Sequence, residues 1–376
     1  MNYIFHYKKR LLTLVLIGIG FASSVYLIST SQLSLWDFRN NLWGPAYLQW
    51  NGQSPYNIGV LFPRGNAVWF PPVIGFFGFL GALPQAQASM LWTILNILAL
   101  LVLIMLAIDY RPSPGRLAFA FMASFLLLPT VTHLRLGQFS LILTLTLLLA
   151  AKFLMADHMA GVGSSLALAV TKPQLLILAV PGLVQKVWQH ARWRGIWRLM
   201  IWSTLFLLLF CLPLFLRYPA WVGDFRRALQ QNPAWLQPVL WRLLPGWWGW
   251  PGRLIVVGLL LLAFAANVFL WRRLPAYEAM LWSLAMTPLV TPYVWGWDFV
   301  LLLPLFLHVL FRIKSRKVLL FLVVSYWLGW AASIGVSLAT DNSNHHYWWL
   351  SWQLFLIAGI ALLWENSQNW GRRCEK

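Results

Sequence analysis

The sequence predicts an all-α, polytopic integral membrane protein of about 12 transmembrane helices with juxtamembrane helices on the outer surface. Hydrophobic residues make up 60% of its 376 residues and charged residues only 10%, whereas soluble domains average roughly 25% charged residues. Apolar runs of about 15–22 residues recur along the chain, and a helix needs ~20 such residues to cross ~30 Å of hydrocarbon. The alternation typical of a transmembrane barrel is absent from the sequence.

The first crossing is expected at 11–28, where a basic N-terminus precedes a long apolar run without a clear cleavage site. The further expected crossings are 87–108, 117–134, 138–155, 160–171, 173–186, 197–216, 253–271, 276–291, 297–311, 317–337 and 347–364. An even number of crossings places both termini on the same side. The basic ends of the chain favour the cytoplasm for that side.

The basic residues support this topology. The segments expected inside hold 19 of the 28 Lys and Arg residues, as the positive-inside rule requires. The net charge of +19 therefore indicates cytoplasmic loops rather than a nucleic-acid-binding surface. The two cysteines, Cys211 and Cys374, are too few for a disulfide framework or a zinc site.

Two stretches leave the topology open. Residues 68–84 allow a short crossing or a helix along the outer surface, and Pro71-Pro72 favours a helix start. Residues 161–184 allow one crossing or two half-length helices that meet at Lys172-Pro173. A lysine at the centre of the bilayer is costly and proline interrupts helical hydrogen bonding. We therefore expect two short helices with Lys172 at their outer ends.

The whole chain, 1–376, is expected to form one integral membrane domain. Its expected parts are a first module 1–216 with an outer loop 29–86, a second large outer loop 217–252, and C-terminal helices 253–376. Within the first outer loop, 41–50 is expected to be a surface helix and 51–56 a turn.

Only nine residues are acidic, and Asp37 follows the first expected crossing between Trp36 and Phe38. It is either an interfacial anchor or a general base that takes the proton of an acceptor hydroxyl. Asp298 is either the N-terminal charge of a helix or a contact to substrate. Asp224 and Asp341 lie in hydrophilic loops and are expected to be solvated.

Two cations lie among apolar residues. Lys172 requires an anion or an acceptor as partner, unless it extends to the membrane surface, and Arg135 separates two apolar runs. Together they are expected to neutralise a phosphate or pyrophosphate leaving group. His133 and Gln138 are expected to hydrogen-bond sugar or phosphate, or to cap the turn between these runs.

Several motifs are missing from the sequence. It contains no P-loop, no H-E-x-x-H and no G-x-S-x-G, which excludes ATP-driven pumps of that kind, zinc hydrolases with that motif and elbow-type esterases. No expected crossing carries several carboxylates, so a relay of acidic residues is not expected.

The order of the remaining motifs is similar to that of a known family. An aspartate after the first crossing is followed by AYLQWNGQSPY, WFPP, LRLGQFSLILTL, GVGSSLALAVTKPQLLIL and TPYVWGWDFVLLLP. This order resembles the GT-C membrane glycosyltransferases, specifically glycosyltransferase family 87, formerly a domain of unknown function, over about 30–310. The resemblance implies an enzyme that moves a sugar, such as mannose, from a polyprenyl-phosphate sugar to a glycolipid or glycan at the outer face of the membrane.

The resemblance also implies roles for individual residues. Asp37 matches the catalytic base, Lys172 the lysine near the lipid phosphate, and Gly137-Gln138 the glycine-glutamine turn. Thr291, Pro292 and Asp298 match the late helix motif, in which Trp297 replaces an expected tyrosine or histidine. The further substrate contacts expected are Tyr56, His133 and Trp297. Because 37–39 is Asp-Phe-Arg rather than D-x-D, we expect a metal-independent enzyme without a cofactor.

Two other classes of protein remain open. A transporter or flippase of a lipid-linked sugar would use the same cations and aromatic residues without a base. A structural subunit of an envelope complex would need neither. Membrane lipids are expected partners in every case, and nucleic acid in none.

Overall fold

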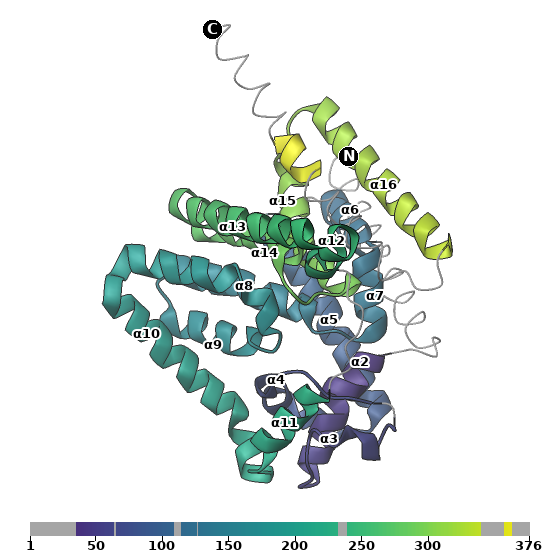
Figure 1. Ribbon diagram of the computed structural model, residues 1–376, viewed down its shortest axis with the longest axis vertical. Helices are drawn as coiled ribbons and strands as arrows, with labels where there is room; N and C mark the ends of the chain where they lie inside the picture. The colour runs from purple at the N-terminus through teal and green to yellow at the C-terminus, as the bar shows by residue number, and fades with distance from the viewer. Residues whose placement is uncertain are drawn as a thin grey trace, which may run out of the picture.

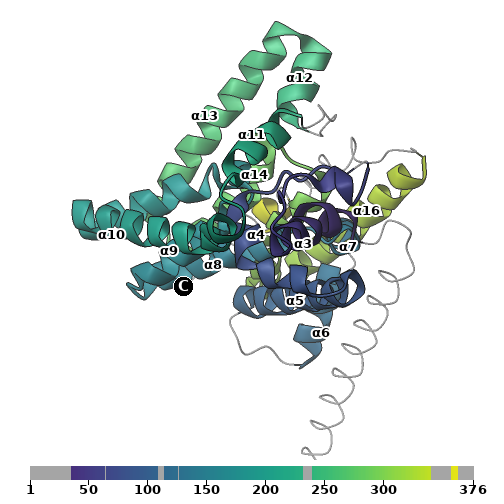
Figure 2. The same cartoon turned by 90° about the horizontal axis from the view of Figure 1, so that it is seen from below.

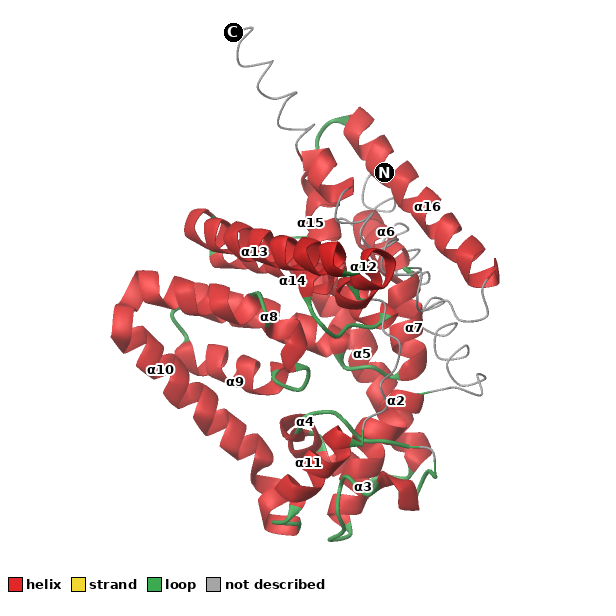
Figure 3. Cartoon of the chain, viewed as in Figure 1, coloured by secondary structure: helices red, strands yellow, loops and turns green. Residues whose placement is uncertain are grey.

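The computed structural model describes residues 35–63, 65–108, 114–125, 127–231, 239–339 and 357–362. These residues form helices and connecting loops, and no strand occurs among them (Figures 1 and 3). The all-α prediction is confirmed for this part of the chain. The expectations for 11–28, Asp341 and Cys374, and for most of 347–364, lie outside the described residues.

The first described segment is a continuous helical stretch. It consists of α2 (Trp36–Phe38), η1 (Arg39–Trp43) and α3 (Gly44–Trp50). A helix at 41–50 is confirmed, but its position on the surface was wrong, because only Tyr47 and Trp50 of this stretch are exposed. The turn expected at 51–56 is confirmed as well and precedes the short η2 (Ile58–Val60).

Residues 68–84 form two short helices, α4 (Pro71–Phe76) and η3 (Gly78–Ala82). Neither is long enough to cross a bilayer. The helix start predicted at Pro71-Pro72 is confirmed. Gly75 lets α4 lie directly on α10, because a Cβ at this position would be 1.8 Å from the carbonyl oxygen of Phe210.

The central helices follow the expected crossings closely. They are α5 (Gln85–Ala107), α6 (Pro114–Phe125), α7 (Leu128–Leu136), α8 (Ser140–Met155) and α9 (Met159–Ala169). The crossing expected at 117–134 is bent by 71° between α6 and α7. A proline in the first turn of α7 explains the bend, since proline has no N–H to continue the helical hydrogen bonding from α6.

The stretch 161–184 is broken at Lys172-Pro173, as expected. After α9, Lys172 is non-helical (φ −128°, ψ 77°) and η4 (Pro173–Leu176) leads into α10 (Ala179–Arg217). The two crossings expected at 173–186 and 197–216 imply a loop between them. This prediction was wrong, because α10 is helical from 186 to 197 except at Arg192 (φ 49°, ψ −141°). Arginine, lysine and glutamine interrupt the apolar pattern without opposing a helix.

The outer loop expected at 217–252 is also largely helical, with α11 (Trp221–Gln230) and α12 (Leu240–Trp248). Asp224 is not simply solvated, which corrects the prediction. It accepts hydrogen bonds from Ser54 and from Tyr218 (3.0 Å) and pairs with Arg227. These contacts join α11 to the turn at 51–56.

The C-terminal half contains α13 (Trp250–Arg273), α14 (Ala276–Val290), η5 (Gly296–Leu302), α15 (Leu303–Arg312) and α16 (Arg316–Ala339). Glu278 lies in the first turn of α14 and pairs with Arg312 at 2.9 Å. Figure 1 shows α2, α3, α4 and α11 grouped at one end of the molecule, and Figure 2 views that end.

Three described helices, α5, α10 and α13, are long and apolar enough to cross a membrane, and the bent pair α6–α7 is a fourth candidate. The most apolar window of α5 is 56% buried, but those of α10 and α13 are each only 17% buried. Apolar helix faces exposed to this extent require a lipid environment. The chain therefore has the character of a membrane protein, and the count of twelve crossings stays a prediction.

Candidate active site

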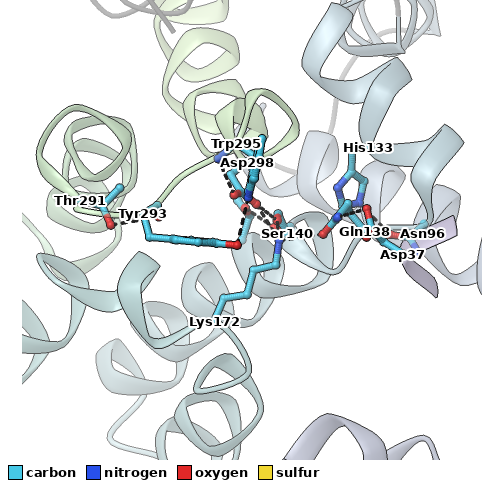
Figure 4. Close-up of polar contacts among 11 residues, drawn as sticks. Asp37, Asn96, His133, Gln138, Ser140, Lys172, Thr291, Tyr293, Trp295 and Asp298 are labelled. Atoms are coloured by element: carbon cyan, nitrogen blue, oxygen red, sulfur yellow. Dashed lines mark hydrogen bonds and ion pairs between the residues drawn. The ribbon is translucent and has the colours of Figure 1, made fainter. Parts of the chain in front are cut away.

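Polar side chains from segments far apart in the sequence meet in the interior (Figure 4). Asp37 comes from α2, and Gln138 and Ser140 come from the junction of α7 and α8. Lys172 comes from the break between α9 and η4, and Asp298 from the first turn of η5. We call these five residues the polar network.

Gly137 brings the first two segments together. It ends α7 in the left-handed conformation (φ 67°), and its carbonyl oxygen accepts a hydrogen bond of 2.8 Å from Trp92 Nε1. A Cβ at Gly137 would lie 2.6 Å from the Cβ of Phe38. Only glycine therefore permits both this turn and the close approach of α2, which places Asp37 beside Gln138.

Lys172 has the partners that its apolar surroundings require. Its side chain is 8% exposed, and Nζ donates to Gln138 Oε1 (2.8 Å), Ser140 Oγ (2.9 Å) and Asp298 Oδ1 (2.7 Å). An ammonium has three N–H donors, so all of them are occupied. The alternative in which Lys172 extends to the membrane surface is wrong.

Asp298 is fully buried. Its Oδ1 accepts from Lys172 and from Ser140 Oγ (2.5 Å), and its Oδ2 accepts from the backbone N–H of Trp295 (3.1 Å). The backbone N–H of Asp298 in turn donates to the Trp295 carbonyl (2.9 Å). Both oxygens are thus bonded to the chain itself, and the start of η5 fixes the carboxylate.

Asp37 is the partly exposed carboxylate of the network. Its Oδ2 accepts a 2.5 Å hydrogen bond from Gln138 Nε2. Burial raises the pKa of Asp37 to about 6, although the charge of Lys172 and the hydrogen bond from Gln138 oppose the change. A carboxylate with such a pKa is a stronger base than an ordinary aspartate and is still mostly ionised at neutral pH.

His133 lies behind the network and is fully buried. Its Nε2 is 3.0 Å from Asn96 Oδ1, and its carbonyl oxygen accepts from the Gln138 backbone N–H (3.1 Å). Its Nδ1 has no hydrogen-bond partner among the described residues. His133 therefore supports the turn through its backbone, and its hydrogen bond to sugar or phosphate stays a prediction.

The other predicted site residues lie outside the polar network. Arg135 is exposed on α7, and its carbonyl oxygen accepts from the Leu35 N–H (2.7 Å). Tyr56 is buried 5.0 Å from Phe225, measured between ring centroids. Trp297 stacks on Trp295 with ring centroids 5.2 Å apart, directly before Asp298. Their contacts with substrate stay predictions.

Two residues of this region were not foreseen. Ser140 bonds both charges of the Lys172–Asp298 pair, and Asn96 holds His133. Each lies in a mostly apolar helix that contains other polar residues as well. The signal in the sequence is therefore weak, although a buried polar side chain requires a hydrogen-bond partner.

Apolar helices around a buried network of two carboxylates, an amide and an ammonium define a membrane protein with a polar site. Residues 70–292, more than half of the chain, match the model of Glycosyltransferase family 87, so the chain belongs to this family of glycosyltransferases. No curated protein and no solved structure matches the chain, and the GT-C fold therefore stays a prediction. The matched range contains Gln138, Ser140 and Lys172 but neither Asp37 nor Asp298.

Proposed function

We propose that the chain moves a sugar, with mannose as the first candidate, from a polyprenyl-phosphate sugar to a glycolipid or glycan at the outer face of the membrane. Its family supports transfer of a sugar. The observation that carries the chemical assignment is Asp37, a partly exposed carboxylate with a pKa near 6 that Gln138 holds by a short hydrogen bond.

In this proposal Asp37 is the general base. It takes the proton of the acceptor hydroxyl while that oxygen attacks the anomeric carbon, and the bond from this carbon to the phosphate oxygen breaks. The phosphate leaves as an anion and needs no general acid, so one carboxylate suffices, unlike the pair that glycoside hydrolysis uses. A single displacement of this kind inverts the anomeric configuration.

Cations are proposed to stabilise the leaving phosphate. The exposed guanidinium of Arg135 can form paired hydrogen bonds to phosphate oxygens. The contact predicted between Lys172 and the phosphate requires Lys172 to leave Asp298, because Asp298 balances its charge and its three N–H groups are occupied. Tyr56 and Trp297 are proposed to contact the sugar with their rings, and His133 and Gln138 to complete the polar contacts. With Phe38 and Arg39 after Asp37 instead of a second carboxylate, no metal or other cofactor is part of the proposal.

Transfer and transport can be separated in one preparation. The purified chain is reconstituted in liposomes with EDTA, radiolabelled polyprenyl-phosphate mannose and a mixed glycolipid fraction as acceptor. The proposal expects label in the glycolipids. Label that crosses the bilayer while still on the donor lipid would instead support the transporter or flippase. No transfer with this donor or with the glucose and arabinose analogues would contradict the proposal.

A further inference from the structure

We propose that Asp298 and Ser140 are positioning residues that hold Lys172 and, through it, orient the Gln138 amide toward Asp37. This inference rests on the proposed function, since it concerns the same base. It assigns a task to a buried carboxylate that has no access to solvent and to a serine that the sequence did not single out. The connection runs through the five side chains of the polar network, all of them labelled in Figure 4.

Asp298 cannot act on a substrate directly in this arrangement. It is fully buried, and both its oxygens are bonded to Lys172, Ser140 or the Trp295 backbone. Asp298 can therefore affect the reaction only from a distance, through its contact with Lys172 and through the effect of its charge on the pKa of Asp37. The contrast with Asp37, which is partly exposed and bonded to an amide, separates the roles of these two carboxylates.

The Gln138 amide connects the two charged groups in one orientation. Its Oε1 accepts from Lys172 Nζ, and its Nε2 donates to Asp37 Oδ2. A flipped amide would turn its N–H groups toward the ammonium and its oxygen toward the carboxylate, which are two repulsive contacts. The position of Lys172 therefore decides the orientation of the amide, and Ser140 and Asp298 decide the position of Lys172.

The charge of Asp298 matters as well as its geometry. Asp298 neutralises Lys172, so Asp37 lies across Gln138 from a pair without net charge. The other charged or titratable groups nearby are His133 and Arg135 on α7, Arg39, which lies against the rings of Trp36 and Phe62, and Tyr293, whose hydroxyl oxygen accepts from Trp295 Nε1 (3.1 Å; Figure 4). Helix α5 packs on η1, the helix that follows Asp37, and contains no charged or titratable residue.

Replacing Asp298 by asparagine keeps the shape of the side chain and removes its charge. Lys172 would then act on Asp37 uncompensated and favour its ionised form. When the transfer rate is plotted against pH, the rate falls at low pH, and we call this fall the acid limb. We expect the midpoint of the acid limb to move from about 6 toward the ordinary aspartate pKa of 3.8. Lys172→Gln should move the limb in the opposite direction. The double variant Lys172→Gln/Asp298→Asn should have a limb closer to that of the parent than either single variant.

Ser140→Ala tests the positioning without a change of charge. We expect a lower kcat, with the acid limb and the KM for the donor unchanged. Ser140→Thr keeps the hydroxyl and should recover most of the rate. A general loss of structure would instead lower the rate of both serine variants, and it would not move the acid limbs of the two charge variants in opposite directions.

The control is Asp157→Asn, the same chemical change at an exposed aspartate whose left-handed backbone (φ 52°) suits asparagine. Removing one member of a buried pair can unfold a protein, whereas removing both is better tolerated. All variants are therefore compared after size-exclusion chromatography, and the double variant keeps the test valid if the single ones do not fold. Either of two results would overturn the inference. In the first, the acid limb of Asp298→Asn stays where it is in the parent protein. In the second, the acid limb of the double variant is displaced as far as that of Lys172→Gln.

Failure of the proposed function is distinct, because then Asp37→Asn would remain active.

Discussion

At the scale of single residues, the site contains two aspartates with opposite environments. Asp298 is fully buried, and the positive charge of Lys172 balances its negative charge. Asp37 is partly exposed, and its only contact within the polar network is with the neutral amide of Gln138. Environments that separate two carboxylates in this way separate their roles. Asp37 is the one placed to exchange a proton with a substrate.

The pKa of Asp37 leads to a pH dependence. The base works only when ionised, and its pKa is raised from 3.8 to about 6, so protonation removes activity as the pH falls through about 6. At pH 5, kcat/KM for transfer should be about a tenth of its plateau, because the ratio of ionised to protonated Asp37 falls tenfold with each pH unit below the pKa. A rate that stays at its plateau down to pH 4.5 would contradict this environment for Asp37.

The sequence allowed part of this site to be predicted. Asp37, Gln138 and Lys172 were identified because charged and polar residues between apolar runs are rare and costly. The partner of Lys172 was not predictable, because Asp298 lies 126 positions further along the chain and their contact depends on how η4, α8 and η5 pack. Ser140 and Asn96 were missed because a single polar residue hardly changes the apolar pattern of a helix.

At the scale of elements, the turn at Gly137 decides where α2 lies. Gly137→Ala should lower the stability of the fold in two ways. An alanine in the left-handed conformation costs about 1–2 kcal/mol. Its Cβ would also lie 2.6 Å from Phe38 Cβ, and such overpacking costs about 1–3 kcal/mol. We expect reduced thermal stability in detergent and a strong loss of transfer, because α2 must move.

Gly52→Ala is the matched control for this variant. Gly52 has the same φ of 67°, but nothing lies within 4 Å of an added Cβ. It should show only the smaller, conformational cost. Equal losses of stability in the two alanine variants would show that the contact between Gly137 and Phe38 contributes nothing.

Helix boundaries show where sequence patterns succeed and fail. The break at Lys172-Pro173 was predictable because a lysine and a proline both oppose a continuous apolar helix at that point. The continuity of α10 was not, since the basic residues from 186 to 198 end the apolar pattern but favour a helix. The same reasoning explains why α11 and α12, which are rich in charge and tryptophan, were expected to be loop.

At the scale of the whole molecule, the exposed apolar faces of α10 and α13 define a surface for lipid. Tryptophans such as Trp247 and Trp250 are exposed where α13 begins, which is typical of a membrane interface. The basic residues predict the sidedness of the chain. The first outer loop and the kink of α10 are predicted to lie on opposite sides.

Cysteine labelling tests this sidedness. Gln53→Cys and His190→Cys are both at exposed positions, and Cys374→Ser removes the natural thiol of the tail from the background. A membrane-impermeant maleimide should label Gln53→Cys in intact cells and His190→Cys only after permeabilisation. Labelling of His190→Cys alone in intact cells would reverse the topology and move the proposed active site to the cytoplasmic face.

The central claim is that Asp37 is the base of a sugar transfer. The most direct measurement is the rate of transfer from labelled polyprenyl-phosphate sugar by Asp37→Asn, beside Asp157→Asn. The account predicts a loss of at least about 100-fold for Asp37→Asn, as expected for a missing general base, with donor binding retained and the control at the parent rate. Transfer by Asp37→Asn at the parent rate would contradict it.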